Sequence, residues 1–181
     1  DPAASSFFEN GAYNLAKSRQ GKKSSAQMIK LWADWIAKYP IVSIEDGLNE
    51  NDWNGFKAMT TALGGKIQIV GDDLFVTNVK FVARGIKEQA ANAVLIKLNQ
   101  IGSVSETIQT IQMCQRAGWN YVISHRSGET EDAFMADFAV AMGGGQIKTG
   151  SACRSERIAK YNRLLEIEAE LGKVATFGGS L

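Results

Sequence analysis

The chain contains 181 residues, of which 20 are basic, 19 are acidic and 45% are hydrophobic. This length is enough for one domain with a buried core, and the balanced charge does not suggest a nucleic-acid surface. No apolar run reaches the roughly 18 residues that a membrane-spanning helix needs, and no secretory leader is recognisable, so we expect a cytoplasmic protein. Cys114 and Cys153 fit no metal-binding spacing, and we expect both to be reduced and at least partly buried.

The stretch that follows Asp1-Pro-Ala-Ala-Ser-Ser-Phe-Phe8, through Ser25, is rich in Gly, Ser, Asn and Lys, and we expect it to be a long loop with little regular structure. A helical pattern then begins near Met28, with Ser24 or Ser25 as its N-cap, and Pro40 ends it. Further helices are predicted over 50–62, over 79–90, from Ser103 to Gly118 behind a capping box, before Gly143, and near the end of the chain. Strands are predicted at 41–44, 66–70, within 92–101, at 121–124 and at 146–147.

The strand within 92–101 is the most apolar of these, yet Lys97 stands near its C-terminal end. Such a lysine either lies buried among carboxylates or extends to water, and this stretch alone favours the second. The other strands also end in charged residues, however, at Glu45, Asp72, His125-Arg126 and Lys148. In an α/β TIM barrel the C-terminal strand ends meet at one mouth. A doubly wound sheet would carry a Gly-rich turn after its first strand, which this sequence lacks, so a barrel is predicted.

A complete barrel has eight strands and about 250 residues, whereas only five strands are predicted here. Five strands alone would leave two unpaired edges. Asp1 also resembles the acid that follows a barrel strand. We therefore expect residues 1–181 to be the C-terminal part of a larger barrel protein, incomplete on its own.

The acidic strand ends are candidates for a metal site. Asp1, Glu45 and Asp72 would meet at a barrel mouth, and three carboxylates suit Mg²⁺ while leaving room for water and substrate oxygens. Arg126 and Ser127, followed by glycine, suit a phosphate group, because they combine a guanidinium fork with a hydroxyl.

Lys97 and Lys148 would face the same cavity, where one can act as a general base and the other can stabilise the anion that proton removal creates. Other polar residues have simpler interpretations. Asp46 and Asp73 are expected to cap turns or helices, and His125, the one histidine, is more often structural than catalytic in such a position. A solvated or salt-bridged helix face is expected for Arg154, Arg157 and Lys160.

Five motifs resemble the enolase family: Ser43-Ile-Glu-Asp46, Val70-Gly-Asp-Asp-Leu74 with Val76-Thr-Asn78, Leu95-Ile-Lys-Leu-Asn-Gln-Ile-Gly102, Val122-Ile-Ser-His-Arg-Ser-Gly-Glu-Thr-Glu-Asp132 and Gly145-Gln-Ile-Lys-Thr-Gly150. The resemblance covers essentially all 181 residues and is closer to bacterial than to animal members. It implies the C-terminal part of an enolase barrel domain, with the N-terminal capping domain and the first barrel strands absent from these residues.

The resemblance implies the reversible, Mg²⁺-dependent dehydration of 2-phosphoglycerate to phosphoenolpyruvate, with two magnesium ions per site during turnover. The implied ligands of the first magnesium are Asp1, Glu45 and Asp72. Arg126 and Ser127 would bind the substrate phosphate. The enolase superfamily is a known example of a lysine or histidine base that works with magnesium.

Lys97 is implied as the base that removes the C2 proton and Lys148 as the contact to the substrate carboxylate, so both also bind substrate. His125 would line the catalytic site. The glutamate that helps to expel the C3 hydroxyl lies earlier in the family's barrel, so we expect the segment alone to be inactive. A homodimer or larger oligomer of the complete protein is implied.

Two alternatives remain open. One is a non-catalytic binding role of an enolase fragment, including a cell-surface or secreted pool, and the other is a different lyase or racemase of the same superfamily. The expected phosphate-binding residues indicate a phosphorylated substrate, which is evidence against the second alternative.

Overall fold

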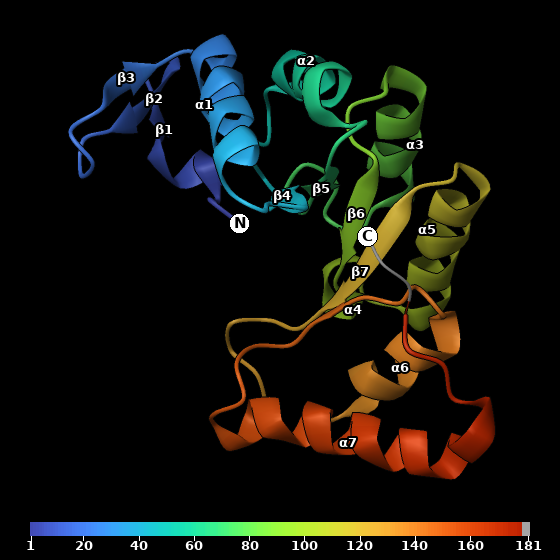
Figure 1. The fold of residues 1–181 in the computed structure, drawn as a ribbon. Coiled ribbons are helices and arrows are strands. Elements are labelled where there is room, and N and C mark those ends of the chain that lie inside the picture. The colour runs from blue at the N-terminus through green and yellow to red at the C-terminus, as the bar shows by residue number, and fades with distance from the viewer. Residues whose placement is uncertain (179–181) are drawn as a thin grey trace.

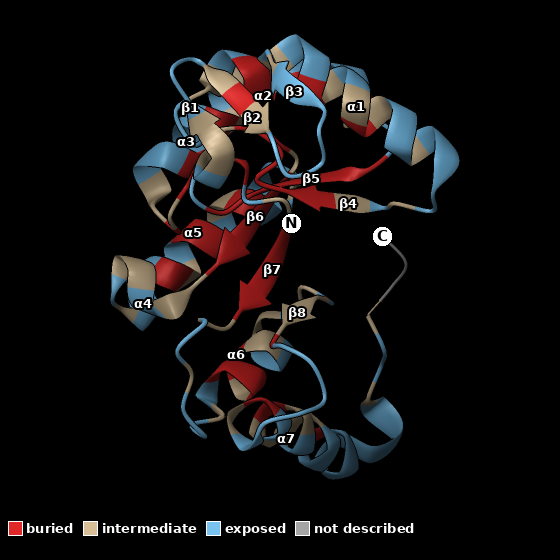
Figure 2. Cartoon of the chain, turned by 90° about the vertical axis from the view of Figure 1, so that its left-hand side faces the viewer, coloured by how far each residue is buried: buried red, intermediate tan, exposed pale blue. Residues whose placement is uncertain are grey.

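Five parallel strands form the centre of the molecule and follow one another in chain order across the sheet. The computed structural model describes residues 1–178, and its parallel strands are β4 (Ser43–Glu45), β5 (Gln68–Gly71), β6 (Ala93–Ile96), β7 (Asn120–Ser124) and β8 (Ile147–Lys148). Each strand pairs in parallel with the next, and the sheet curls (Figure 2). The sheet is therefore a half-barrel with β4 and β8 as its outer strands. This confirms the predicted TIM-barrel-type fold and its incompleteness.

Helices alternate with the strands along the chain and lie on the outer side of the curl (Figure 1). Their bounds are α1 (Ser25–Lys38), α2 (Trp53–Leu63), α3 (Val79–Glu88), α4 (Leu98–Ile101), α5 (Val104–Arg116), α6 (Phe134–Met142) and α7 (Ser155–Leu171), with 3₁₀ turns η1 (Ala4–Phe7) and η2 (Gly172–Val174). The start of α1 is a capping box, in which Ser24 accepts from the N–H of Gln27 and the Gln27 side chain accepts from the N–H of Ser24. Buried residues concentrate on the strands and on the helix faces against them (Figure 2).

The two faces of the sheet pack differently. Val94 and Ile96 belong to the large apolar core beneath the helices. A second, smaller buried cluster is formed by alternate residues of the strands, namely Val70, Ala93, Leu95 and Val122. Gln68 lies two residues before Val70 and therefore shares its face. Its side chain bonds that of Gln146 at 3.0 Å. Gln146 directly precedes β8, which is not a neighbour of β5 in the sheet. The bond therefore crosses the inside of the curl near the N-terminal strand ends.

The prediction of little regular structure before residue 25 is wrong. This segment forms an antiparallel sheet of β1 (Phe8–Glu9), β2 (Ala12–Leu15) and β3 (Gly21–Lys23). Tyr13 anchors it, because its ring is fully buried and its hydroxyl donates to Asp52 at 3.2 Å and accepts from the N–H of Asn49 at 2.9 Å. Asn10 and Gly11, both with positive φ, make the hairpin turn.

Cys114 is buried as predicted, whereas Cys153 is exposed, contrary to prediction. Both are free thiols. None of the helices within residues 1–178 combines the length and apolar character needed to cross a bilayer.

Candidate active site

The C-terminal ends of β4 to β8 bring charged side chains to one edge of the sheet. Glu45 ends β4, Lys148 ends β8, and Asp72 and Lys97 directly follow β5 and β6. An open cavity of about 640 Å³ at this edge is lined by Asp1, Asp72, Asp73, Lys97, Asn99, Ser124, His125, Arg126, Ser127, Gly128 and Lys148. The predicted convergence is thus observed for these residues, and Glu45 joins the group through its contact with Lys148.

The ammonium of Lys148 bridges two of the predicted acids. Its Nζ lies 2.8 and 2.9 Å from the two carboxylate oxygens of Glu45 and 2.9 Å from Oδ2 of Asp1. Glu45 is only 8% exposed, and a buried carboxylate is costly without a positive partner. The two acids therefore converge on a point that already holds a cation.

Lys97 forms the second pair of the site. Its Nζ donates to Oδ2 of Asp72 at 2.5 Å, and the side chains are 15% and 11% exposed. The backbone N–H of Lys97 donates at 2.9 Å to the hydroxyl of Thr77, which is fully buried. Lys97 is thus paired with a carboxylate and mostly buried, so the interpretation that this stretch alone favoured, a strand-end lysine that extends to water, is wrong.

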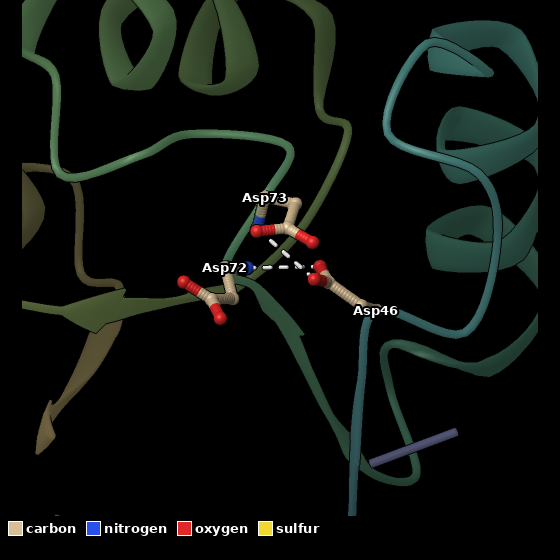
Figure 3. A group of neighbouring side chains, drawn as sticks. All are labelled: Asp46, Asp72 and Asp73. Atoms are coloured by element: carbon tan, nitrogen blue, oxygen red, sulfur yellow. Dashed lines mark hydrogen bonds between the residues drawn. The ribbon is translucent and has the colours of Figure 1, made fainter. Parts of the chain in front are cut away.

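Asp46 acts as the predicted turn cap. Its two carboxylate oxygens accept from the backbone N–H groups of Asp72 and Asp73 at 2.9 Å each (Figure 3), and its own backbone has a φ of 45°. Burial raises the pKa of Asp46 to about 7, although the two N–H donors act in the opposite direction. Asp46 therefore joins the turn after β4 to the turn after β5.

The donor chemistry of the site fits a hard divalent cation. Ligand atoms of Asp46, Asp72 and Asp73 lie within 4.8 Å of one another, but Asp46 is already engaged by N–H donors and the Asp72 carboxylate points away from it (Figure 3). Asp1, Glu45 and Asp72 instead have their oxygens on lysine ammoniums. Magnesium and calcium prefer carboxylate oxygens as ligands, so these three acids are suitable ligands for either ion.

The loop after β7 carries the predicted phosphate-binding residues. The guanidinium of Arg126 donates to the side chain of Asn99 at 2.9 Å, and its backbone N–H donates to Glu129 at 2.8 Å. The N–H of His125 donates to the carbonyl of Lys148 at 2.9 Å, which joins the loop to β8. Burial, followed by the nearby charge of Arg157, lowers the pKa of His125 below its ordinary value, which favours the neutral ring.

The basic residues of α7 were expected to form a solvated or salt-bridged face. Arg154 fits this, since its side chain is 69% exposed and pairs with Glu156 at 2.7 Å. Arg157 and Lys160 are only 7% and 0% exposed, so they are not solvated, whereas the salt-bridged alternative is confirmed by their pairs with Glu156 and Glu129. They lie beneath the loop after β7 and donate to its backbone. A basic pair three residues apart on a helix is the one sequence signal that could have indicated a shared buried face.

The chain matches the family description "Enolase, C-terminal TIM barrel domain" over residues 1–181. It is 71% identical to Enolase 1 of Methylococcus capsulatus over 98% of its residues. It is 66% identical to the enolase of Desulfotalea psychrophila over 98% of its residues, and 59% identical to Enolase 1 of Methanospirillum hungatei over 99%. The chain spans 42% of the length of each of these relatives.

Proposed function

This chain belongs to the enolase family, and we propose that the protein containing it interconverts 2-phosphoglycerate and phosphoenolpyruvate in glycolysis. Residues 1–181 would supply the C-terminal part of the barrel and most of the residues that touch substrate. The observation that carries this proposal is the cavity at the strand ends, whose lining includes three aspartates, two lysines and an arginine–serine pair. These are the groups needed to hold a phosphorylated acid and remove a proton from it.

Proton removal is assigned to Lys97. A proton on the carbon beside a carboxylate is weakly acidic, so the base must be held rigidly and the anion must be neutralised as it forms. Lys97 is fixed through the buried hydroxyl of Thr77. Before it can accept the C2 proton, it must pass its own proton to solvent in the open cavity and release its contact with Asp72.

Lys148 is assigned to the substrate carboxylate. Its ammonium reaches into the cavity while it contacts Glu45 and Asp1. At this place it would stabilise the negative charge that grows on the carboxylate when the C2 proton leaves.

Arg126 and Ser127 would bind the phosphate. Both line the cavity, and the guanidinium of Arg126 has no carboxylate partner among the ion pairs formed by residues 1–178. A guanidinium fork next to a hydroxyl matches the oxygens of a phosphate group. His125 lines the same cavity and is assigned to the catalytic site.

Magnesium is the proposed cofactor, held by Asp1, Glu45 and Asp72, with a second ion per site during turnover. When bound, it supplies positive charge that makes the C2 proton more acidic and offsets the charge of the intermediate. The acid that expels the C3 hydroxyl is not assigned to this chain, so we propose that the isolated segment is inactive. A cytoplasmic location and a homodimeric or larger assembly of the complete protein are further parts of the proposal.

The test uses the complete protein. We expect wild-type protein to turn over 2-phosphoglycerate, and Lys97→Ala to lose exchange of the C2 proton with solvent while magnesium binding stays measurable. Lys87→Ala, which changes an exposed lysine of α3, is the matched control and should exchange normally. Near-normal exchange in Lys97→Ala would remove Lys97 from this role.

The alternatives give different outcomes in the same assays. A purely non-catalytic binding protein would not turn over 2-phosphoglycerate at any magnesium concentration. Another lyase or racemase of the superfamily would accept a substrate without the phosphate group. Comparison of 2-phosphoglycerate with unphosphorylated glycerate therefore separates the three functions.

A further inference from the structure

The loop after β7, which carries the proposed phosphate-binding residues, is irregular backbone, yet it is attached closely to α7. Residues 125–130 have no helix or strand. Arg157 donates to the carbonyl oxygens of Arg126 and Ser127 at 2.9 and 2.8 Å, and also bonds Nδ1 of His125. One guanidinium thus contacts three successive residues of the loop, all of which line the cavity.

Lys160 holds the same loop from its other end. Its Nζ donates to the carbonyl oxygen of Thr130 at 2.5 Å and lies 2.6 Å from the carboxylate of Glu129. The other oxygen of Glu129 accepts from the backbone N–H of Arg126 at 2.8 Å. Lys160 therefore acts on Arg126 through Glu129, and the loop is closed on itself by a buried ion pair.

Arg157 and Lys160 are buried cations, and burying a cation costs free energy that its hydrogen bonds must offset. Arg157 is 7% exposed and Lys160 is fully buried. A buried charge is unfavourable unless its donors are used, and here they are used largely on loop carbonyls. A fully satisfied buried network of this kind makes its members rigid.

The contact between Arg157 and His125 also selects a tautomer. A guanidinium is a donor without acceptor capacity, so Nδ1 of His125 must accept and cannot carry a proton. A neutral ring then has its proton on Nε2. The lowered pKa of His125 agrees with this neutral form.

We propose that Arg157 and Lys160 are positioning residues that hold His125, Arg126 and Ser127 in the geometry that binds the phosphate group, and that Arg157 keeps His125 as the Nε2–H tautomer. This rests on the proposed function for the identity of the substrate. The order of the loop and the tautomer of His125 do not depend on it.

The experiment compares variants of the complete, magnesium-loaded protein. Arg157→Lys keeps the charge but places all its donors on one nitrogen, so it loses the planar fork whose two nitrogens reach separate acceptors in the loop. Glu129→Gln keeps an acceptor for Arg126 while it removes the charge opposite Lys160. We expect each variant to raise KM for 2-phosphoglycerate and the inhibition constant of inorganic phosphate by a similar factor, about tenfold for Arg157→Lys. The affinity for magnesium should stay unchanged, because neither residue contacts the proposed ligands.

Arg163→Gln is the matched control on the same helix. Arg163 pairs with Asp137, Glu166 and Glu170 and does not contact the loop. Its loss should alter the unfolding temperature without changing KM or phosphate inhibition. Equal changes in KM for Arg163→Gln and Arg157→Lys would show a general loss of stability and overturn the positioning role.

A second measurement reads the protonation of the His125 ring in wild-type protein. The ¹⁵N spectrum of wild-type protein, with the His125 signals identified by comparison with His125→Gln, should show a neutral ring protonated on Nε2 at pH 7. A ring protonated on Nδ1 would overturn the proposal. If wild-type protein bound phosphate but did not turn over 2-phosphoglycerate, the proposed function would fail, whereas the phosphate and ¹⁵N measurements would still decide the present inference.

Discussion

Replacing Lys148 by Met separates the structural use of this lysine from its chemical use. The ammonium contacts both carboxylate oxygens of Glu45 and one of Asp1, and Glu45 is 8% exposed. Breaking a fully buried ion pair typically costs about 3–5 kcal/mol. Because the Lys148 side chain is 36% exposed, solvent screens the pair. We therefore expect a loss of about 1–2 kcal/mol in the free energy of unfolding without magnesium.

Magnesium should change this result. If Glu45 and Asp1 bind the ion, a cation replaces the missing ammonium, and ligand binding to the folded state stabilises it by mass action. We expect saturating Mg²⁺ to recover most of the lost stability of Lys148→Met, while turnover stays reduced by about 10²–10³. The assay is urea unfolding of the complete protein with magnesium or with a chelator, followed by steady-state kinetics.

The control is Lys30→Met, because Lys30 pairs with Asp34 on the surface, where the side chains are 75% and 62% exposed. An exposed pair of this kind contributes about 0.3–0.5 kcal/mol, independently of magnesium. An equal stability loss for Lys148→Met with and without Mg²⁺ would refute the assignment of Glu45 and Asp1 as magnesium ligands.

Two further predictions concern the parts of the fold that support the site. Tyr13→Phe removes the hydroxyl that joins Asp52 to the N–H of Asn49, so unfolding should cost about 1–2 kcal/mol less while kcat/KM stays unchanged. Although burial alone would raise it, the hydrogen bond from Lys160 leaves the pKa of Glu129 below its ordinary value. A depressed carboxyl pKa adds stability above the ordinary value of 4.5 that is lost as the pH falls through the folded-state pKa. Acid unfolding of Glu129→Gln should therefore depend less steeply on pH than that of wild-type protein, and identical slopes would contradict the role of this pair.

The parallel strands were predictable because their signal is local. Each is a short apolar run followed by a charged residue, and the alternation with helices predicts parallel pairing. The N-terminal hairpin was missed although Asn10-Gly11 is a strong turn signal. Its strands are short and polar, and their stability depends on Tyr13, whose partners Asn49 and Asp52 lie far along the chain.

The site was predictable to the same extent and for the same reason. Residues at the strand ends must meet if the sheet is parallel, so the positions of Glu45, Asp72 and Lys97 followed from the pattern. The role of Arg157 did not, because α7 approaches the loop after β7 only through tertiary packing. A helical pattern shows which residues share a face, but it does not show whether that face meets solvent or backbone carbonyls.

The acids and lysines of the site neutralise one another in pairs. Each of the carboxylates of Glu45 and Asp72 is buried and has an ammonium within 2.9 Å. The lysines can therefore satisfy these carboxylates when no metal is bound, and a metal that takes over the carboxylates would free the same ammoniums for substrate. On this argument the groups assigned to the chemistry also contribute to the stability of the fold. The free energy of unfolding and the magnesium affinity should then change together in variants of Lys97 and Lys148. In variants of Arg157 the magnesium affinity should not change, and magnesium should stabilise the fold as much as it does in wild-type protein.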